Sequence, residues 1–212
     1  MRMPMRSRVT EAWRAMFKRL LVPFILMLAF APGAQAAGGH YVFDGGTHAE
    51  QAQVIAALNA SSFSWNVVPG PVVIHIGSAV SPHAVAGQIW LDAALLDSGR
   101  FSWGVVQHEY AHQIDFAVLT DAMRADLHGQ LQGTAWWGSI SSHAQLDCEQ
   151  FADSLAWAYW QSPDNVMKPD ASAGEGGKVV PAAFRAKLDS LLHLNSVRTT
   201  ASVRAKGHPR NG

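Results

Sequence analysis

Two histidines and a glutamate lie at a spacing that suits metal chemistry, in the run His108-Glu109-Tyr110-Ala111-His112. On a helix, positions i and i+4 share one face, so both imidazoles can bind the same metal ion. Glu109 follows His108 by about 100° around the helix, near enough to accept a proton from a water molecule at the metal. With ten histidines and five glutamates in 212 residues, chance predicts about 0.01 matches to this pattern. The run therefore indicates a metal site.

A catalytic zinc site needs a third protein ligand. One arrangement places a histidine or aspartate six positions after the second histidine, but Val118 occupies that position. The other common arrangement uses a glutamate from a later helix, and the glutamates that follow the motif are Glu149 and Glu175. Glu175 lies in a glycine-rich segment, whereas Glu149 lies in a predicted helix. We therefore expect His108, His112 and Glu149 to bind one Zn²⁺ per chain.

Two aspartates can orient a ligand histidine. Asp153 lies four positions after Glu149, on the same helix face, where its carboxylate can accept the N–H that the imidazole does not use for metal. Such a hydrogen bond fixes the tautomer of the ring. Asp115, three positions after His112, is a competing candidate for this role.

Five helices and two strands are predicted to position these residues. The run Thr47-His48-Ala49-Glu50 is a capping box, which predicts that a helix begins there. The predicted helices cover residues 47–61, 100–116, 121–131, 144–160 and 181–194, and the predicted strands cover residues 71–77 and 87–92. Residues 169–179 are expected to form a loop. Helices outnumber strands, so the predicted fold class is α+β.

The first 36 residues have the pattern of a secretory signal peptide. Six basic side chains and one acidic side chain accompany an apolar stretch at residues 20–31, and the triplet Ala34-Gln35-Ala36 is a cleavage signal. The apolar stretch is interrupted by Pro23 and is short for a membrane span. We expect cleavage near Ala36, a secreted or periplasmic protein, and no membrane attachment after cleavage; an uncleaved membrane anchor is the alternative.

Charge is distributed unevenly along the chain, although the formal net charge is zero. Residues 37–212 hold ten basic and fifteen acidic side chains, and the segment 196–212 holds four basic side chains and no acidic one. An acidic body argues against nucleic-acid binding. We expect residues 37–195 to form one domain, 196–212 to be a disordered basic tail, and the protein to be a monomer. The single cysteine, Cys148, cannot form an intramolecular disulfide and is expected to be a small buried side chain.

The two motifs together resemble zincin metallopeptidases of the gluzincin type, which combine H-E-x-x-H with E-x-x-x-D; here the second motif is Glu149-Gln150-Phe151-Ala152-Asp153. The chain is similar to bacterial peptidases of the titration factor A kind and to the catalytic domains of lethal-factor-like peptidases. The resemblance covers residues 87–160. It implies a zincin-like domain, with a small sheet whose edge strand lies over the active-site helix and with a mostly helical C-terminal part.

The same resemblance implies the activity and the partner. It implies a zinc-dependent endopeptidase in which Glu109 is the general base for a zinc-activated water, and in which the substrate is a peptide or a protein. Gln88, Ile89 and Trp90 lie where such enzymes have the edge strand that pairs with an extended substrate. His83 and His143 are candidates for stabilising the oxyanion, and Trp136-Trp137 are candidates for lining the cleft.

Two other functions remain open at this point. One is a catalytically silent zinc-binding module for adhesion or partner binding, and the other is a metal-dependent hydrolase of a non-peptide amide. The presence of Glu109 argues against the silent module, because metal binding alone needs only the three ligands.

Overall fold

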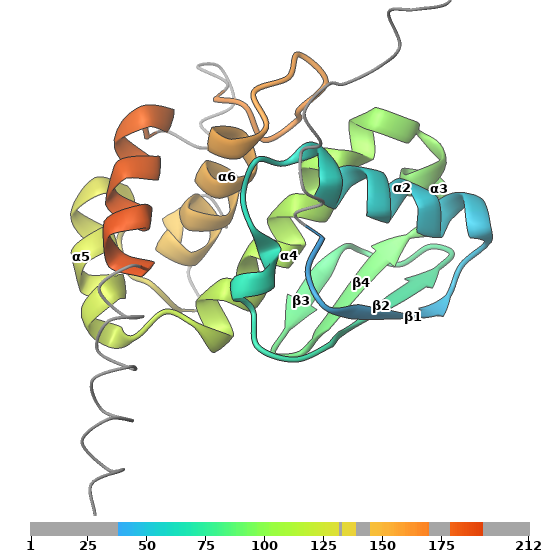
Figure 1. The fold of residues 1–212 in the computed structure, drawn as a ribbon, viewed down its shortest axis with the longest axis horizontal. Coiled ribbons are helices and arrows are strands. Elements are labelled where there is room, and N and C mark those ends of the chain that lie inside the picture. The colour runs from blue at the N-terminus through green and yellow to red at the C-terminus, as the bar shows by residue number, and fades with distance from the viewer. Residues whose placement is uncertain (1–37, 132, 139–144, 170–178, 193–212) are drawn as a thin grey trace, which may run out of the picture. The chain divides into compact units, whose positions relative to one another are not determined.

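The computed structural model describes residues 38–131, 133–138, 145–169 and 179–192, all within one compact unit, Ala36–Gly212 (Figure 1). The predicted signal segment 1–36, the predicted tail 196–212, most of the loop 169–179 and His143 lie outside the described residues. Within the described ranges the fold is α+β, as predicted. None of the helices in those ranges combines the length and the apolar character that a membrane crossing requires.

A four-stranded mixed sheet forms one part of the fold. Its strands are β1 (Tyr41–Gly45), β2 (Val72–Gly77), β3 (His83–Val85) and β4 (Gln88–Asp92), in the order β1-β2-β4-β3. β1, β2 and β4 run parallel, and β3 is antiparallel to β4. The two predicted strands are confirmed as β2 and β4, while β1 and β3 were not predicted.

The expectation that Gln88, Ile89 and Trp90 lie on an edge strand is wrong. β4 pairs with β2 on one side and with β3 on the other. The chain folds back through a two-residue loop, so that Val85 pairs with Gln88 and the three-residue β3 occupies the edge.

Five labelled helices accompany the sheet: α2 (His48–Ala60), α3 (Ala93–Asp97), α4 (Trp103–Ala117), α5 (Asp121–Leu131) and α6 (Asp147–Tyr159). Residues 181–192 are also helical, and short 3₁₀ segments cover Trp65–Val67 and Gly99–Ser102. The capping box is confirmed at α2, where Thr47 Oγ1 accepts from the Glu50 amide at 3.3 Å and Glu50 Oε2 accepts from the Thr47 amide at 2.6 Å.

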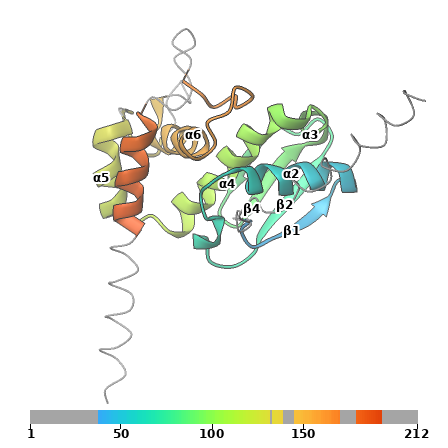
Figure 2. The ribbon, with the colours of Figure 1, turned by 45° about the horizontal axis from the view of Figure 1, so that its top comes forward.

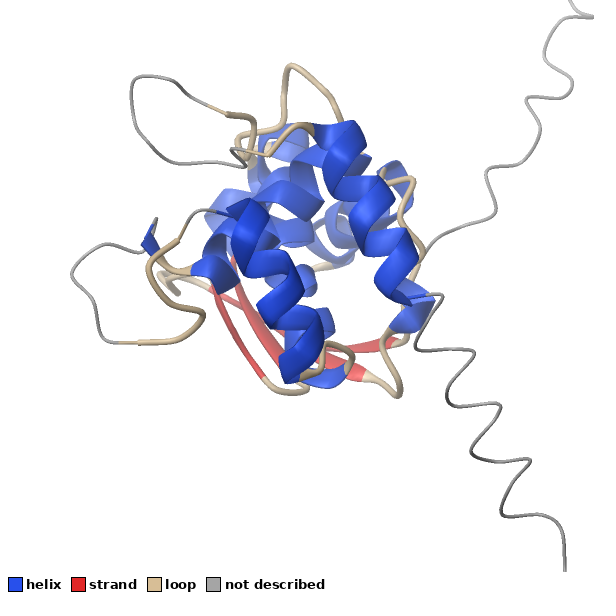
Figure 3. Cartoon of the chain, turned by 90° about the vertical axis from the view of Figure 1, so that its left-hand side faces the viewer, coloured by secondary structure: helices blue, strands red, loops and turns tan. Residues whose placement is uncertain are grey.

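The helices lie on one face of the sheet (Figure 3). Residues of β2 and β4 alternate accordingly: Ile74, Ile89 and Leu91 are buried, whereas His75 and Trp90 between them are partly exposed. This alternation is the period-2 pattern of a sheet with a single covered face.

Helix α4 lies between the sheet and a second group of helices, which contains α5, α6 and residues 181–192 (Figures 1 and 2). Phe151 of α6 and Phe184 of the last helix are both fully buried and pack with ring centroids 5.9 Å apart. Because α4 is covered on both sides, most of its side chains are buried, including several polar ones. Buried polar groups need partners, and those of α4 form the site described next.

Candidate metal centre

The two histidines of α4 point the same way. His108 and His112 are 8% and 6% exposed, and their Nε2 atoms lie 3.1 Å apart. The four-residue spacing on a regular helix produces this arrangement, because it stacks the two side chains one turn apart. Their rings are nearly perpendicular, with an interplanar angle of 84°.

Helix α6 brings Glu149 to the same point. Its Oε2 lies 3.2 Å from Nε2 of His108 and 3.4 Å from Nε2 of His112. Burial alone would raise the pKa of the Glu149 carboxyl, but the hydrogen bonds and charges of the two histidines hold that pKa well below its usual range. The carboxylate is therefore ionised, which is the form that a metal ion binds.

The spacing of these three atoms fits a tetrahedral metal site. Metal–ligand bonds of 2.0–2.1 Å place the corners of a tetrahedron about 3.3 Å apart. The three separations among His108 Nε2, His112 Nε2 and Glu149 Oε2 are 3.1, 3.2 and 3.4 Å. The donor set, two imidazoles and one carboxylate, is one that zinc accepts.

Glu109 lies beside this centre. Ligand atoms of His108, Glu109 and His112 fall within 4.8 Å of one another, so this buried group could also hold a metal ion. The ligand atoms of this group lie farther apart than Glu149 Oε2 lies from the two histidine Nε2 atoms. Glu149 therefore fits the third position of a tetrahedral site better than Glu109 does. Burial raises the pKa of Glu109, and the charge of Glu149 raises it further against the lowering effect of the two histidines.

Asp153 contacts the outer nitrogen of His108. Its Oδ1 lies 2.8 Å from Nδ1 of the imidazole, and the side chain is buried. Because a carboxylate can only accept, Nδ1 carries a hydrogen, which leaves Nε2 as the nitrogen whose lone pair binds a metal ion once its own proton is lost. Burial alone would lower the pKa of His108, but its hydrogen bonds with Asp153 and Glu149 raise that pKa well above the usual value.

Asp115, the competing candidate, makes different contacts. It is fully buried and accepts from Arg124 Nε at 2.8 Å and from Trp136 Nε1 at 3.0 Å. Burial raises the pKa of the Asp115 carboxyl, and its hydrogen bonds with Arg124 and Trp136 oppose that shift. Of the two aspartates, Asp153 is therefore the one that contacts a histidine of the candidate centre, whereas Asp115 joins α4 to α5 and to the segment 133–138.

The two adjacent tryptophans have separate environments. Trp136 is partly buried, bonds to Asp115 and packs near Phe151, whereas Trp137 is 48% exposed. Trp137 stacks on Phe116 with ring centroids 5.8 Å apart, and Phe116 stacks on His112 at 6.1 Å. Phe116 was not expected at the site, although its position four residues after His112 places it on the same helix face.

The residues of β4 that were expected to bind substrate make contacts within the fold. The Gln88 side chain lies 3.0 Å from Nε2 of His75, and Ile89 is in the core. Trp90 is stacked between His75 and His83, at centroid distances of 4.7 and 4.6 Å. The strand at this edge of the sheet is therefore β3 and not β4.

His83, on β3, is the edge residue whose charge reaches Glu109. The ring is exposed, its Nδ1 lies 2.8 Å from the carbonyl oxygen of Ser81, and its charge lowers the pKa of Glu109. β3 also contacts α4 directly.

Cys148 is a buried thiol, as expected. Its Sγ lies 3.7 Å from Oε1 of Glu149. Burial and the charge of Glu149 raise the pKa of the thiol to about 12, so the group stays neutral at physiological pH.

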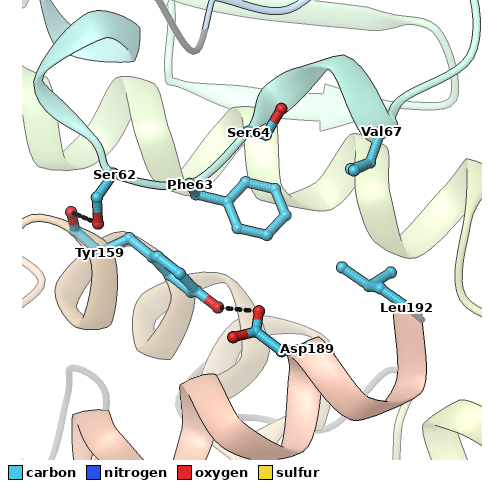
Figure 4. A pocket seen from close by; sticks show the side chains of 7 residues that line it. All are labelled: Ser62, Phe63, Ser64, Val67, Tyr159, Asp189 and Leu192. Carbon is cyan, nitrogen blue, oxygen red and sulfur yellow. Dashed lines mark hydrogen bonds between the residues drawn. The ribbon is translucent and has the colours of Figure 1, made fainter. Parts of the chain in front are cut away.

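A separate pocket of about 460 Å³ lies between the segment 62–67, the end of α6 and the last helix (Figure 4). Two of the residues that line this pocket are hydrogen-bonded to each other: the Tyr159 hydroxyl donates to Asp189 at 3.1 Å. Its lining residues are distinct from those of the metal centre.

Comparison of the chain with protein-family models, with curated proteins and with solved structures gives no match. The resemblance to zincins therefore depends on the two sequence motifs alone.

Proposed function

We propose that this protein is a secreted, zinc-dependent endopeptidase. The observation that carries the proposal is the convergence of His108 Nε2, His112 Nε2 and Glu149 Oε2 to mutual distances of 3.1–3.4 Å. Three protein ligands leave one position of a tetrahedral ion open, as in hydrolytic zinc sites. A zinc ion bound there would act as a Lewis acid for a substrate carbonyl and lower the pKa of water.

Glu109 is the general base in this proposal. It is buried one residue after His108, and its pKa is raised by that burial, which makes the carboxylate a better proton acceptor. It would take the proton from the attacking water and pass it to the leaving nitrogen. A module that only binds metal has no need of a buried carboxylate at this position.

Asp153 is a positioning residue in the same proposal. By accepting from Nδ1 it holds the His108 ring in one tautomer and one orientation. Asp115 would act less directly, through Arg124 and Trp136.

The substrate would be an extended peptide or protein segment. The free edge of β3, rather than β4, offers backbone groups for pairing with such a chain. The exposed face of Trp137, stacked on Phe116 beside His112, offers an apolar surface for a substrate side chain near the scissile bond. The predicted signal peptide at residues 1–36 supports secretion.

Cleavage of a mixed peptide library tests this function. The wild-type protein and Glu109→Gln are compared at equal zinc occupancy. We expect cleavage by the wild type and a loss of at least about 10² in rate for the variant, which is the usual contribution of a general base. Zinc binding by both proteins with no peptide cleavage by either would instead support a silent zinc-binding module or a hydrolase of another amide.

A further inference from the structure

The side chain of Gln113 makes three hydrogen bonds to one hairpin. Its Oε1 accepts from the Gly87 amide at 2.7 Å, and its Nε2 donates to the carbonyl oxygens of Val85 at 2.9 Å and Gln88 at 3.1 Å. The residue is 1% exposed. One glutamine of α4 thus binds the turn that joins β3 to β4, using both of its donor hydrogens and its acceptor oxygen.

Gln113 lies four residues after Glu109, so the two side chains share a face of α4 and lie one turn apart. The hairpin that Gln113 binds therefore lies on the side of the helix that carries Glu109. The effect of the His83 charge on Glu109 agrees with this placement.

The turn itself needs external support. Gly87 has a φ of +79°, and the only non-glycine residue with positive φ in the described ranges is Ala79, so Ala86 has a negative φ. A negative φ followed by a positive φ is the combination of a type II turn, which matches the twist of paired strands poorly in a two-residue hairpin. The three bonds from Gln113 hold the hairpin in this conformation.

We propose that Gln113 is a positioning residue that fixes the free edge of β3 at a set distance from Glu109 and the metal centre, and so sets the affinity for an extended peptide. The inference rests on the proposed peptidase function. It assigns Gln113 no contact with the metal ligands and no role in the chemical step, because all three of its hydrogen bonds go to the hairpin.

Two variants and a matched control test the proposal. Gln113→Met removes all three bonds at similar side-chain volume. Gln113→Glu keeps the acceptor for Gly87 but faces two carbonyl oxygens with a carboxylate. Gln107→Met is the control, because Gln107 is a fully buried glutamine on the same helix whose Nε2 donates to Ala57 of α2 at 2.7 Å.

The first readout is the division of effects between KM and kcat. For a peptide long enough to pair with β3, we expect both Gln113 variants to raise KM about tenfold, equivalent to about 1.4 kcal/mol, while kcat changes less than about threefold. For a dipeptide-sized substrate, and for zinc affinity, they should match the control. An equal effect of Gln113→Met and Gln107→Met on KM for the long peptide would overturn the proposal.

The second readout, hydrogen exchange in the metal-free protein, does not require activity. We expect Gln113→Met to speed exchange of the Gly87 amide at least about tenfold and to leave the amides of α6 unchanged, whereas Gln107→Met leaves Gly87 protected. Unchanged protection of Gly87 in Gln113→Met would also overturn the proposal. A wild-type protein that cleaves no peptide would contradict the proposed function and with it the KM effect, while exchange at Gly87 still decides whether Gln113 holds the hairpin.

Discussion

Oδ1 of Asp153, on α6, lies 2.8 Å from Nδ1 of His108, on α4. The two residues are 45 positions apart in the chain, so this contact depends on the packing of the two helices. It joins the face of α4 that carries His108 and His112 to the helix that supplies Glu149, and it directs Nε2 of His108 towards Nε2 of His112 and Oε2 of Glu149.

Asp153→Asn should weaken zinc binding by about 10- to 100-fold, as is typical when the partner of a ligand histidine is changed. The amide keeps the size of the side chain but loses the charge that favours the Nδ1–H tautomer. Competition with a chromogenic chelator measures the affinity. Asp115→Asn is the control, since Asp115 bonds to Arg124 and Trp136 and should leave zinc affinity within about threefold. A larger loss in Asp115→Asn than in Asp153→Asn would show that the orienting roles had been assigned to the wrong aspartate.

Glu149→Ala and Glu109→Gln should differ in metal content. Because Glu149 lies at the third corner and Glu109 beside it, removal of Glu149 should abolish stoichiometric zinc binding, whereas Glu109→Gln should retain one zinc per chain. Elemental analysis after dialysis against a weak chelator gives the zinc-to-protein ratio. Zinc retained by Glu149→Ala and lost from Glu109→Gln would make Glu109 the ligand.

Cys148 should make the metal-free protein less stable at alkaline pH. The unfolded thiol has a pKa of about 8.5, whereas burial and the Glu149 charge raise the folded value to about 12. The unfolded state therefore loses its proton first, and the stability that the neutral buried thiol provides below pH 8.5 is lost as pH rises towards the folded pKa.

Urea unfolding of the wild type and of Cys148→Ala measures this effect. The difference in unfolding free energy between them should shift by about 2 kcal/mol against the wild type from pH 7 to pH 10. A pH-independent difference, or rapid labelling of the folded thiol at pH 8, would contradict the assignment.

Gly39→Ala should destabilise the fold near α4. A Cβ at Gly39 would overlap the Tyr110 hydroxyl and lie 2.7 Å from its Cζ. Tyr110 is fully buried and donates to the carbonyl oxygen of His40 at 3.2 Å, so it cannot move away freely. We expect a loss of about 1–3 kcal/mol, measured by thermal unfolding.

Gly129→Ala is the matched control for that substitution. Gly129 lies inside α5 and a Cβ there would have no neighbour within 4 Å, so alanine should stabilise the protein by about 1 kcal/mol through helix propensity. The same sign for both glycine substitutions would mean that the contact of Gly39 with Tyr110 does not constrain the fold.

Local patterns in the sequence predicted most of the helices and part of the site. The Thr47–Glu50 capping box begins α2, and the four-residue spacing of His108 and His112 places both on one face of α4. The choice of Glu149 as the candidate third ligand was made by elimination, because the chain holds few glutamates after the motif.

Other features depend on tertiary structure and were missed or misplaced. β3 has only three residues and no strong pattern, so nothing local showed that it would displace β4 from the edge. The partners of Asp115 lie on α5 and in the segment 133–138, and the hydrogen bonds of Gln113 reach a hairpin 25 to 28 positions earlier in the chain. Such long-range contacts leave no periodic signal in a single sequence.

Titration of the metal-free protein with zinc, while cleavage of a peptide is recorded, tests the central claim most directly. The account predicts no cleavage in the presence of excess chelator, a rise in rate in proportion to added zinc, and saturation at one equivalent per chain. Cleavage that persists without metal, or a protein that binds one zinc and still cleaves no peptide, would contradict it.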